Sequence, residues 1–197
     1  MEISREASRL FWEQGVAATS GGQIGEAAGL STRTVWRHFR SKASCAEPII
    51  LHGVEWEVAA LRRWKPELSL DGHLADEMSR HARDADRAER ADDALAMKMI
   101  ALSNKEPALR MAWLMACDQV ERELAGSIAG RLDLPADDIR VQMYAAAASG
   151  ALRIVNETIG DALLGGADVR QFAHAHRLLA QAVRSATGGA VGDTTTT

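Results

Sequence analysis

The chain has 197 residues, of which 47% are hydrophobic and 25% charged, and its formal net charge is −4. This length is enough for a small domain beside a larger one, and the hydrophobic content excludes a largely disordered protein. The sequence contains no apolar run of the roughly 18 residues that a membrane span requires and no signal-peptide core near its start. We therefore expect a cytoplasmic protein.

Charge is distributed unevenly along the chain. Residues 1–50 contain six Lys or Arg against five Asp or Glu, so the remainder carries a net charge of −5. Non-specific affinity for DNA grows with the number of phosphates that a protein neutralises. A near-neutral N-terminal part followed by an acidic part therefore suits a DNA-binding protein that does not attach to DNA everywhere.

The first three predicted elements are short helices. The first has a buried side made of Ile3, Ala7, Leu10 and Phe11. Ser20 and Gln23 have the spacing of a capping box, so a second helix begins near Ser20. Gly29 can adopt the left-handed conformation that ends this helix, and Ser31 is a suitable N-cap for the third. Residues 19–42 therefore predict a helix-turn-helix.

The third helix has two different faces. Its apolar side holds Leu30, Val35 and Phe39, and its other side holds Arg33, Trp36, Arg37 and Arg40 at spacings of three and four. A DNA recognition helix needs this division, because its inner face must be fixed while its outer donors reach bases and phosphates. A solvated basic face on an ordinary helical pair has the same spacing, so spacing alone leaves both interpretations open.

A longer pattern decides between them. It consists of Arg9-Leu10-Phe11, Gly15, Thr19-Ser20, Ile24, Ala28-Gly29-Leu30-Ser31, Thr34 and His38-Phe39-Arg40-Ser41-Lys42. This pattern resembles the DNA-binding domain of TetR-family transcriptional regulators. The resemblance implies an all-helical homodimer, in which each subunit has a three-helix DNA-binding head and a larger helical body that holds a small effector molecule.

The same resemblance implies which residues meet DNA. The positions that would contact the major groove or its phosphates are Ser20, Thr32, Arg33, Thr34, Trp36, Arg37, His38 and Lys42. Two features depart from the family pattern. Trp36 stands where tyrosine is usual, and Gly21 and Gly22 stand where relatives often carry larger side chains. The basic N-terminal arm of many relatives is also missing from this sequence, so we expect no minor-groove contact from an arm.

Beyond Lys42 the sequence predicts only helices, and the fold is all-α with about nine of them. The expected ranges are about 42–64, 71–88, 92–103, 107–131, 135–161 and 167–187, with Pro135, Asp137 and Asp138 opening the eighth helix. We expect a helix-turn-helix DNA-binding domain over residues 1–45 and a helical effector-binding and dimerisation domain over 46–187. Residues 188–197 are small and polar and predict a disordered tail.

Pro48 falls inside the fourth expected helix, where it would remove a backbone hydrogen bond and bend or break the helix. In the TetR family this helix connects the effector site to the DNA-binding head. One hypothesis is that a bend near Pro48 helps convert movement of the body into a change in head spacing. A static kink is the alternative.

The last two helices favour self-association. Residues 144–151 are mostly small, and they are followed by an apolar surface made of Leu152, Ile154, Val155 and Ile159. The ninth helix has a matching stripe made of Phe172, Ala175, Leu178, Leu179 and Val183. A four-helix dimer interface is what the resemblance implies, and a palindromic site requires a two-fold partner. An internal core helix would show a similar stripe.

An effector pocket is expected between the middle helices, because sites in helical bundles form from side chains on facing helices. The candidate residues supply adaptable apolar surface and some polar contacts, and they are Trp56, Met97, Met111, Trp113, Met115, Cys117, Met143, Tyr144 and Asn156, with Arg153 as a further polar group. Ordinary core packing is the alternative for each of them. The expected effector is an apolar or aromatic small molecule.

No metal, cofactor or enzymatic site is expected. Cys45 and Cys117 form no CxxC pair, and His73 and His81 are too far apart along a helix to share an ion. The sequence contains no GxSxG, P-loop or dinucleotide-binding motif. A catalytic all-α protein is a distant alternative.

The sequence thus predicts a ligand-responsive transcriptional regulator. We expect a repressor that binds a palindromic double-stranded operator as a homodimer and leaves it when an effector binds. The alternative is a protein of the same fold that binds a ligand or another protein without reading DNA. Trp36 and the neighbouring glycines are the features that would fit this alternative.

Overall fold

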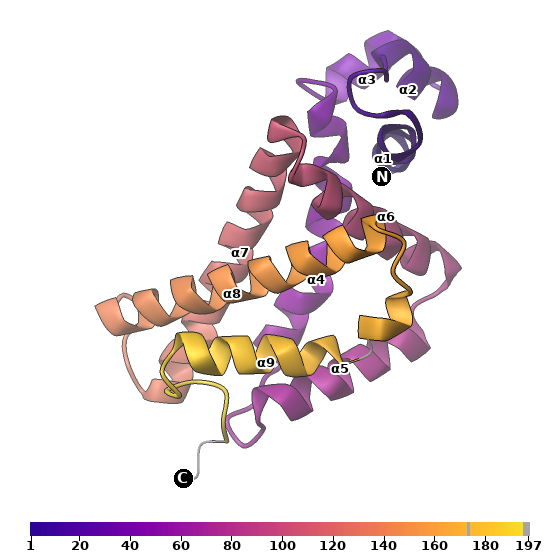
Figure 1. The fold of residues 1–197 in the computed structure, drawn as a ribbon. Coiled ribbons are helices and arrows are strands. Elements are labelled where there is room, and N and C mark those ends of the chain that lie inside the picture. Colours follow the sequence, from indigo (N-terminus) through magenta and orange to yellow (C-terminus); the bar gives the residue numbers. More distant parts are fainter. Residues whose placement is uncertain (173, 195–197) are drawn as a thin grey trace. The chain divides into compact units, whose positions relative to one another are not determined.

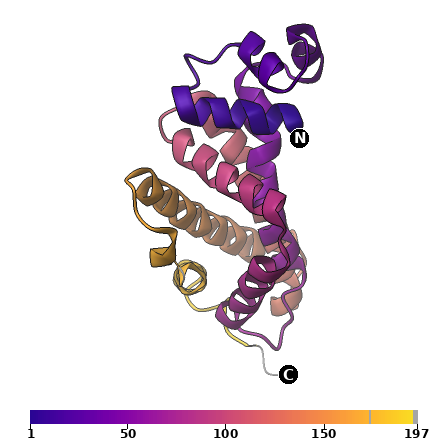
Figure 2. The same cartoon turned by 90° about the vertical axis from the view of Figure 1, so that its right-hand side faces the viewer.

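The computed structural model describes residues 1–172 and 174–194, and all regular structure in this part of the chain is helical. The elements are α1 (Glu2–Gln14), α2 (Gly21–Ala27), α3 (Thr32–His38), the 3-10 helix η1 (Ala43–Ala46), α4 (Glu47–Arg62), α5 (Leu70–Asp84), α6 (Arg87–Ser103), α7 (Pro107–Leu132), α8 (Ile139–Leu164), the 3-10 helix η2 (Val169–Phe172) and α9 (Ala175–Ala186). Figures 1 and 2 show this order. The predicted all-α fold with an N-terminal helix-turn-helix is confirmed.

The chain forms two compact units. The N-terminal unit contains Met1–Val54 and Asp86–Ala116, and the C-terminal unit contains Glu55–Ala85 and the chain from Cys117 onward. One division between them therefore falls inside α4 and another inside α7. These units do not follow the domain division that the sequence suggested, and a head boundary near residue 45 stays a prediction.

In the N-terminal unit, α1 packs against α2, η1 and α6. Phe11 of α1 is fully buried, as are Ile24 of α2 and Val35 of α3. On α6, Asp92 is buried and accepts hydrogen bonds from Arg5 of α1, the shortest of them 2.8 Å long. A part-buried ion pair therefore joins α1 to α6, and α2 packs against both α1 and α3.

In the C-terminal unit, α9 packs against both α5 and α8. The two views place α8 and α9 side by side (Figures 1 and 2). The inward faces of these helices bury Leu70, Leu152, Leu179 and Val183. Burial of each such side chain contributes on the order of 2 kcal/mol, so this apolar layer holds the unit together.

Pro48 lies at the start of α4 and not inside a longer helix. The residues from Ala43 to Ala46 form a 3-10 turn, and the α-helix begins at Glu47. A proline in the first turn removes no hydrogen bond that the helix needs, since the first amides have no intrahelical partner. The prediction of an interior bend at Pro48 is therefore wrong, and the switching hypothesis built on it loses its basis.

Other helix ends differ from the expected ones because of capping side chains. Asp86 and Glu89 form a capping box, so α6 begins at Arg87, earlier than we predicted. Asp138 is the N-cap of α8 and accepts a hydrogen bond from the Arg140 amide at 2.9 Å, so it precedes the first turn instead of lying in it. The expected ninth helix is divided into η2 and α9, and residue 173 between them lies outside the described residues.

The structure differs from the expected disordered tail over residues 188–194. Val191 is buried, and its amide donates to the Thr187 hydroxyl at 3.2 Å. The Gly192 carbonyl accepts from the amide of Leu70, 2.9 Å away. A buried apolar side chain, one hydrogen bond to a side-chain hydroxyl and one backbone hydrogen bond thus fix a segment whose composition suggested disorder. Residues 195–197 lie outside the described part. Among the described helices, none combines the length and apolarity needed to cross a membrane.

Candidate DNA-binding surface and ligand pocket

The capping residues position α2 and α3 as the sequence predicted. The Ser20 hydroxyl accepts from the Gln23 amide at 3.2 Å, and the Gln23 side chain accepts from the Ser20 amide at 2.8 Å. Gly29 has a φ of 67°, which places it in the left-handed region of the turn. Ser31 caps α3 by accepting from the Thr34 amide at 3.1 Å. The predicted helix-turn-helix is present.

The outer face of α3 is cationic and exposed. Val35 points inward and is fully buried, whereas Thr32, Arg33, Arg37 and His38 are exposed. In the part of the chain that the structure describes, no carboxylate pairs with Arg33 or Arg37. These two guanidinium groups can therefore reach a nucleic acid without first breaking an ion pair.

Three of the predicted DNA contacts also make hydrogen bonds within the helix-turn-helix region. Ser20 accepts from the Gln23 amide, and the Thr34 hydroxyl lies 2.9 Å from that of Ser31. The Lys42 ammonium donates to the Ala17 carbonyl at 3.2 Å, which ties the end of the motif to the loop before α2. These side chains therefore stabilise the local structure of the helix-turn-helix region.

Trp36 lies over the first turn of α2. A side chain at Gly21 would place its Cβ 2.7 Å from Cε2 and 2.9 Å from Cη2 of the indole. Trp36 nevertheless leaves 43% of its surface exposed. Trp36 and Gly21 both depart from the family pattern, and in the structure they are in contact with each other.

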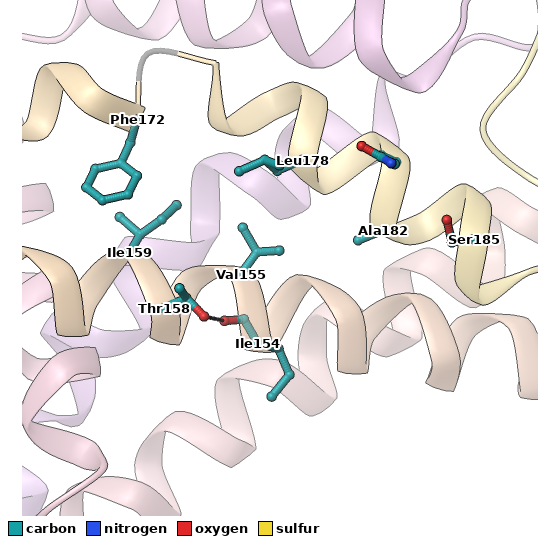
Figure 3. A pocket seen from close by; sticks show the side chains of 9 residues that line it. Ile154, Val155, Thr158, Ile159, Phe172, Leu178, Ala182 and Ser185 are labelled. Atoms are coloured by element: carbon teal, nitrogen blue, oxygen red, sulfur yellow. Dashed lines mark hydrogen bonds between the residues drawn. The ribbon is translucent and has the colours of Figure 1, made fainter.

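A groove between α8 and α9 presents apolar surface to solvent. It encloses about 440 Å³ and is lined by Ile154, Val155, Thr158, Ile159, Phe172, Leu178, Gln181, Ala182 and Ser185. Figure 3 shows side chains of both helices along it. Ile154 and Leu178 are 52% and 54% exposed. Of the two predicted stripes, Leu152, Ala175, Leu179 and Val183 are instead buried within the unit.

An apolar pocket lies inside the C-terminal unit. It is lined by Trp56, Glu57, Leu61, Leu70, Leu74, Leu124, Leu152, Leu179 and Val183, which come from α4, α5, α7, α8 and α9. Its volume of about 20 Å³ is enough for about one water molecule. The pocket is therefore nearly closed in this state.

Glu57 is the ionisable residue of this lining. Its carboxylate accepts a hydrogen bond from the Asn156 side chain at 3.4 Å. Burial among apolar side chains raises the pKa of Glu57 to about 7, and the Asn156 hydrogen bond opposes this shift. Sequence reasoning missed Glu57, because a single glutamate on a helix is usually a solvated surface residue.

Trp56 also borders a second, polar pocket of about 150 Å³, lined by Arg63, Glu77, Arg80, His81 and Asp84. Its indole stacks on the His81 ring at a centroid distance of 5.7 Å. Arg63 and Arg80 both pair with Glu77. The cations of this second pocket are therefore bound to a carboxylate already.

The structure brings few of the predicted effector residues together. Trp56 lines the apolar pocket, and Asn156 contacts its glutamate. Elsewhere in the C-terminal unit Cys117 is buried, Tyr144 is half-buried and Met143 is 63% exposed. Met97, Met111, Trp113 and Met115 belong to the N-terminal unit, where Trp113 is buried and Met111 and Met115 are exposed.

Comparisons with known proteins cover most of the chain. Residues 3–49 match the family model of bacterial regulatory proteins of the tetR family, and residues 73–182 match a model described as the MftR C-terminal domain. The HTH-type transcriptional regulator TcmR of Streptomyces glaucescens is 34% identical over an alignment of 161 residues that covers 79% of this chain and 70% of that protein.

Solved structures share the fold. GusR of Salmonella enterica has a TM-score of 0.58 at 22% identity, with 96% of this chain and 93% of that chain covered. A TetR-family regulator from Mesorhizobium loti has a TM-score of 0.57 at 20% identity, with 95% and 94% covered. These likenesses show the fold, and the two family models together with the 34% identity to TcmR show that the chain belongs to the TetR family of transcriptional regulators.

Proposed function

We propose that this chain is a repressor that binds a palindromic operator as a homodimer and releases it when a small molecule enters the C-terminal unit. The observation that carries the proposal is the outer face of α3, where Arg33 and Arg37 are exposed and have no carboxylate partner among the described residues. Such donors are what a recognition helix offers to guanine edges and phosphates.

The groove between α8 and α9 supports the dimer. A monomer gains nothing from exposing Ile154 and Leu178 beside a groove, whereas a two-fold partner would bury them. Reading a palindrome with one recognition helix per subunit also requires two-fold symmetry, with half-sites about 34 to 36 Å apart or a multiple of this. We therefore propose that a second copy of this chain covers this apolar face.

Release by an effector follows from population shift. A ligand that binds better to one body conformation favours that conformation, and affinity for DNA falls if its heads no longer fit the half-sites. The apolar pocket with Glu57 is the proposed effector site, since its lining comes from five helices and is nearly closed without a ligand. Trp56 and Asn156 are the effector residues retained from the sequence prediction.

A gel-shift titration tests the proposal. The purified protein is titrated against DNA fragments flanking its own coding region, at moderate salt with competitor DNA. We expect a specific shift that Arg33→Ala weakens. Arg122→Ala is the matched control, because Arg122 is an exposed arginine paired with Asp118 in the C-terminal unit.

If neither these fragments nor a genome-wide selection of bound fragments gives a specific complex, the regulator proposal is wrong. The second candidate, a ligand-binding or interaction protein without DNA recognition, would then stand. It is favoured by one observation, the packing of Trp36 against α2 where relatives carry a tyrosine that can reach DNA.

A further inference from the structure

We propose that the apolar pocket of the C-terminal unit takes a cationic amphiphile, an apolar molecule carrying a protonated amine, and that Glu57 recognises its charge. This inference rests on the proposed function in one respect, namely that the pocket is the effector site. It adds the chemical class of the ligand, which the sequence prediction of an apolar or aromatic effector did not contain.

Glu57 is the charged residue among the nine that line this pocket. Eight of the nine lining residues are leucine, valine or tryptophan, and the ninth is Glu57. No lysine, arginine or histidine lines this pocket among the described residues. An anionic ligand would meet like charge in an apolar site, whereas a cation would meet its complement.

Nearby arginines are committed to other carboxylates. On α4, Arg62 binds Glu123 at 2.8 Å and Arg63 pairs with Glu77. On α8, one turn before Asn156, the Arg153 guanidinium binds Glu157 at 2.9 Å. Glu57 has no cationic partner in the described part of the chain and only one hydrogen-bond donor, the amide of Asn156.

A carboxyl group in this position is unfavourable for the empty protein. Glu57 is half-buried, and its carboxyl lies beside apolar side chains with a single 3.4 Å hydrogen bond from a neutral amide. A leucine would fill the same place at lower cost, as leucines do around the rest of the pocket. An incoming ammonium supplies the missing partner, and a charge-assisted hydrogen bond is stronger than the neutral one it joins.

Trp56 adds a second means of recognising a cation. It is adjacent to Glu57 on α4 and lines the same pocket, and its indole is held by stacking on His81. The face of an indole attracts cations, and the attraction increases when the site is desolvated. Because the pocket has a volume of only about 20 Å³, ligand entry must separate the leucines of α5, α8 and α9.

The test compares three probes with the same phenylbutyl part: 4-phenylbutylamine, 4-phenylbutan-1-ol and 5-phenylpentanoate. Binding to the full-length protein is measured by calorimetry without DNA. We expect the amine to bind about tenfold or more tightly than the alcohol and the acid, as a charged hydrogen bond would provide. Glu57→Gln should remove this preference, and it keeps an acceptor for Asn156.

Glu55→Gln is the matched control, since Glu55 is an exposed glutamate on the same helix and should leave the preference unchanged. Circular dichroism melting of each variant checks that it is folded. The proposal is overturned if none of the probes binds, if the alcohol or the acid binds best, or if Glu57→Gln keeps the preference for the amine.

A gel shift on the same preparations separates this inference from the proposed function. Preference for the amine without any DNA complex would leave the pocket chemistry standing and overturn the regulator proposal. A specific DNA complex without any preference for the amine would support the regulator proposal and overturn the inference about the pocket.

Discussion

The indole of Trp36 occupies the space that a side chain at Gly21 would need, so a larger residue at position 21 would require the indole or α3 to move. A tyrosine at residue 36, as is usual in the family, would remove the outer ring that makes this contact. Two substitutions that appear unrelated in the sequence therefore compensate each other. Trp36 thus packs α3 against α2 and still leaves 43% of its surface exposed.

Gly21→Ala should move Trp36 or α3 and lower both the stability of the protein and its affinity for the operator. Overpacking of this kind costs about 1–3 kcal/mol. Trp36→Phe removes the ring atoms that the new methyl group would strike, so the double variant Gly21→Ala/Trp36→Phe should lose less than the sum of the two single variants. Urea unfolding of the four proteins measures this coupling. Strictly additive losses would mean that the contact is not tight.

As a control, Gly22→Ala should be neutral or slightly stabilising. A Cβ at Gly22 would meet the nearest atoms, the hydroxyls of Ser20 and Thr32, at 3.7 and 3.8 Å, which is ordinary van der Waals contact. Alanine is also about 1 kcal/mol more favourable than glycine in a helix.

Arg33 and Lys42 should affect DNA binding differently. Arg33 is exposed on α3 and can reach a base edge, so Arg33→Ala should cost about 1–3 kcal/mol and relax specificity at one operator position. Lys42 is expected to contact a phosphate and not a base, so Lys42→Ala should weaken binding to all sequences similarly. Binding to a library of operator variants distinguishes the two effects. If both variants bind every member of the library as the parent protein does, the DNA-binding face lies elsewhere.

The groove between α8 and α9 should be required for dimerisation. Leu178 is 54% exposed on its edge, so Leu178→Glu would place an unpaired charge in the interface and weaken the dimer more than about a hundredfold. Analytical ultracentrifugation measures the change, and operator binding should be lost with it.

The control for this prediction is Met143→Glu. Met143 is an exposed apolar residue like Leu178 and is 63% exposed, but it lies on α8 and does not line the groove. A dimer that survives Leu178→Glu, or that Met143→Glu disrupts equally, would show that the interface lies on another face.

Local features of the fold could be predicted from the sequence, whereas the pocket could not. The caps at Ser20 and Ser31 depend only on neighbouring backbone, and both have the expected hydrogen bonds. The sequence placed Pro48 inside a helix because the 3-10 turn over Ala43–Ala46, after which α4 begins, has no recognisable sequence pattern. Methionine side chains suit an apolar effector site, but Met111 and Met115 are exposed and belong to the N-terminal unit.

The missed residue, Glu57, shows the physical limit of such reasoning. Its place in an apolar lining exists only when five helices meet, and no spacing within α4 reports on α5, α8 or α9. The contact between Trp36 and Gly21 is hidden for the same reason, because it joins two helices whose relative placement the sequence does not specify.

Glu57 should make the stability of the protein fall as pH rises from about 4.5 to about 7. Burial raises the pKa of this carboxyl from its ordinary value of 4.5 to about 7, so the folded state binds more protons than the unfolded state across this window. The destabilisation is absent at pH values below the ordinary pKa of 4.5 and complete at pH values above the folded-state pKa of about 7. Glu57→Gln should therefore stabilise the protein by on the order of 2 kcal/mol at about pH 8, after allowance for solvent screening, and by little at about pH 5.

Urea unfolding of the parent and of Glu57→Gln at several pH values measures this difference. His73 contributes an opposite slope, because burial lowers its pKa and stability is lost as pH falls below its ordinary value. That contribution is common to both proteins and cancels in the comparison, since His73 bonds to the Ala60 carbonyl at 2.7 Å and not to Glu57. Glu55→Gln should show no such pH-dependent gain. A gain from Glu57→Gln that is the same at acid and alkaline pH would mean that Glu57 is solvated and the pocket is not apolar around it.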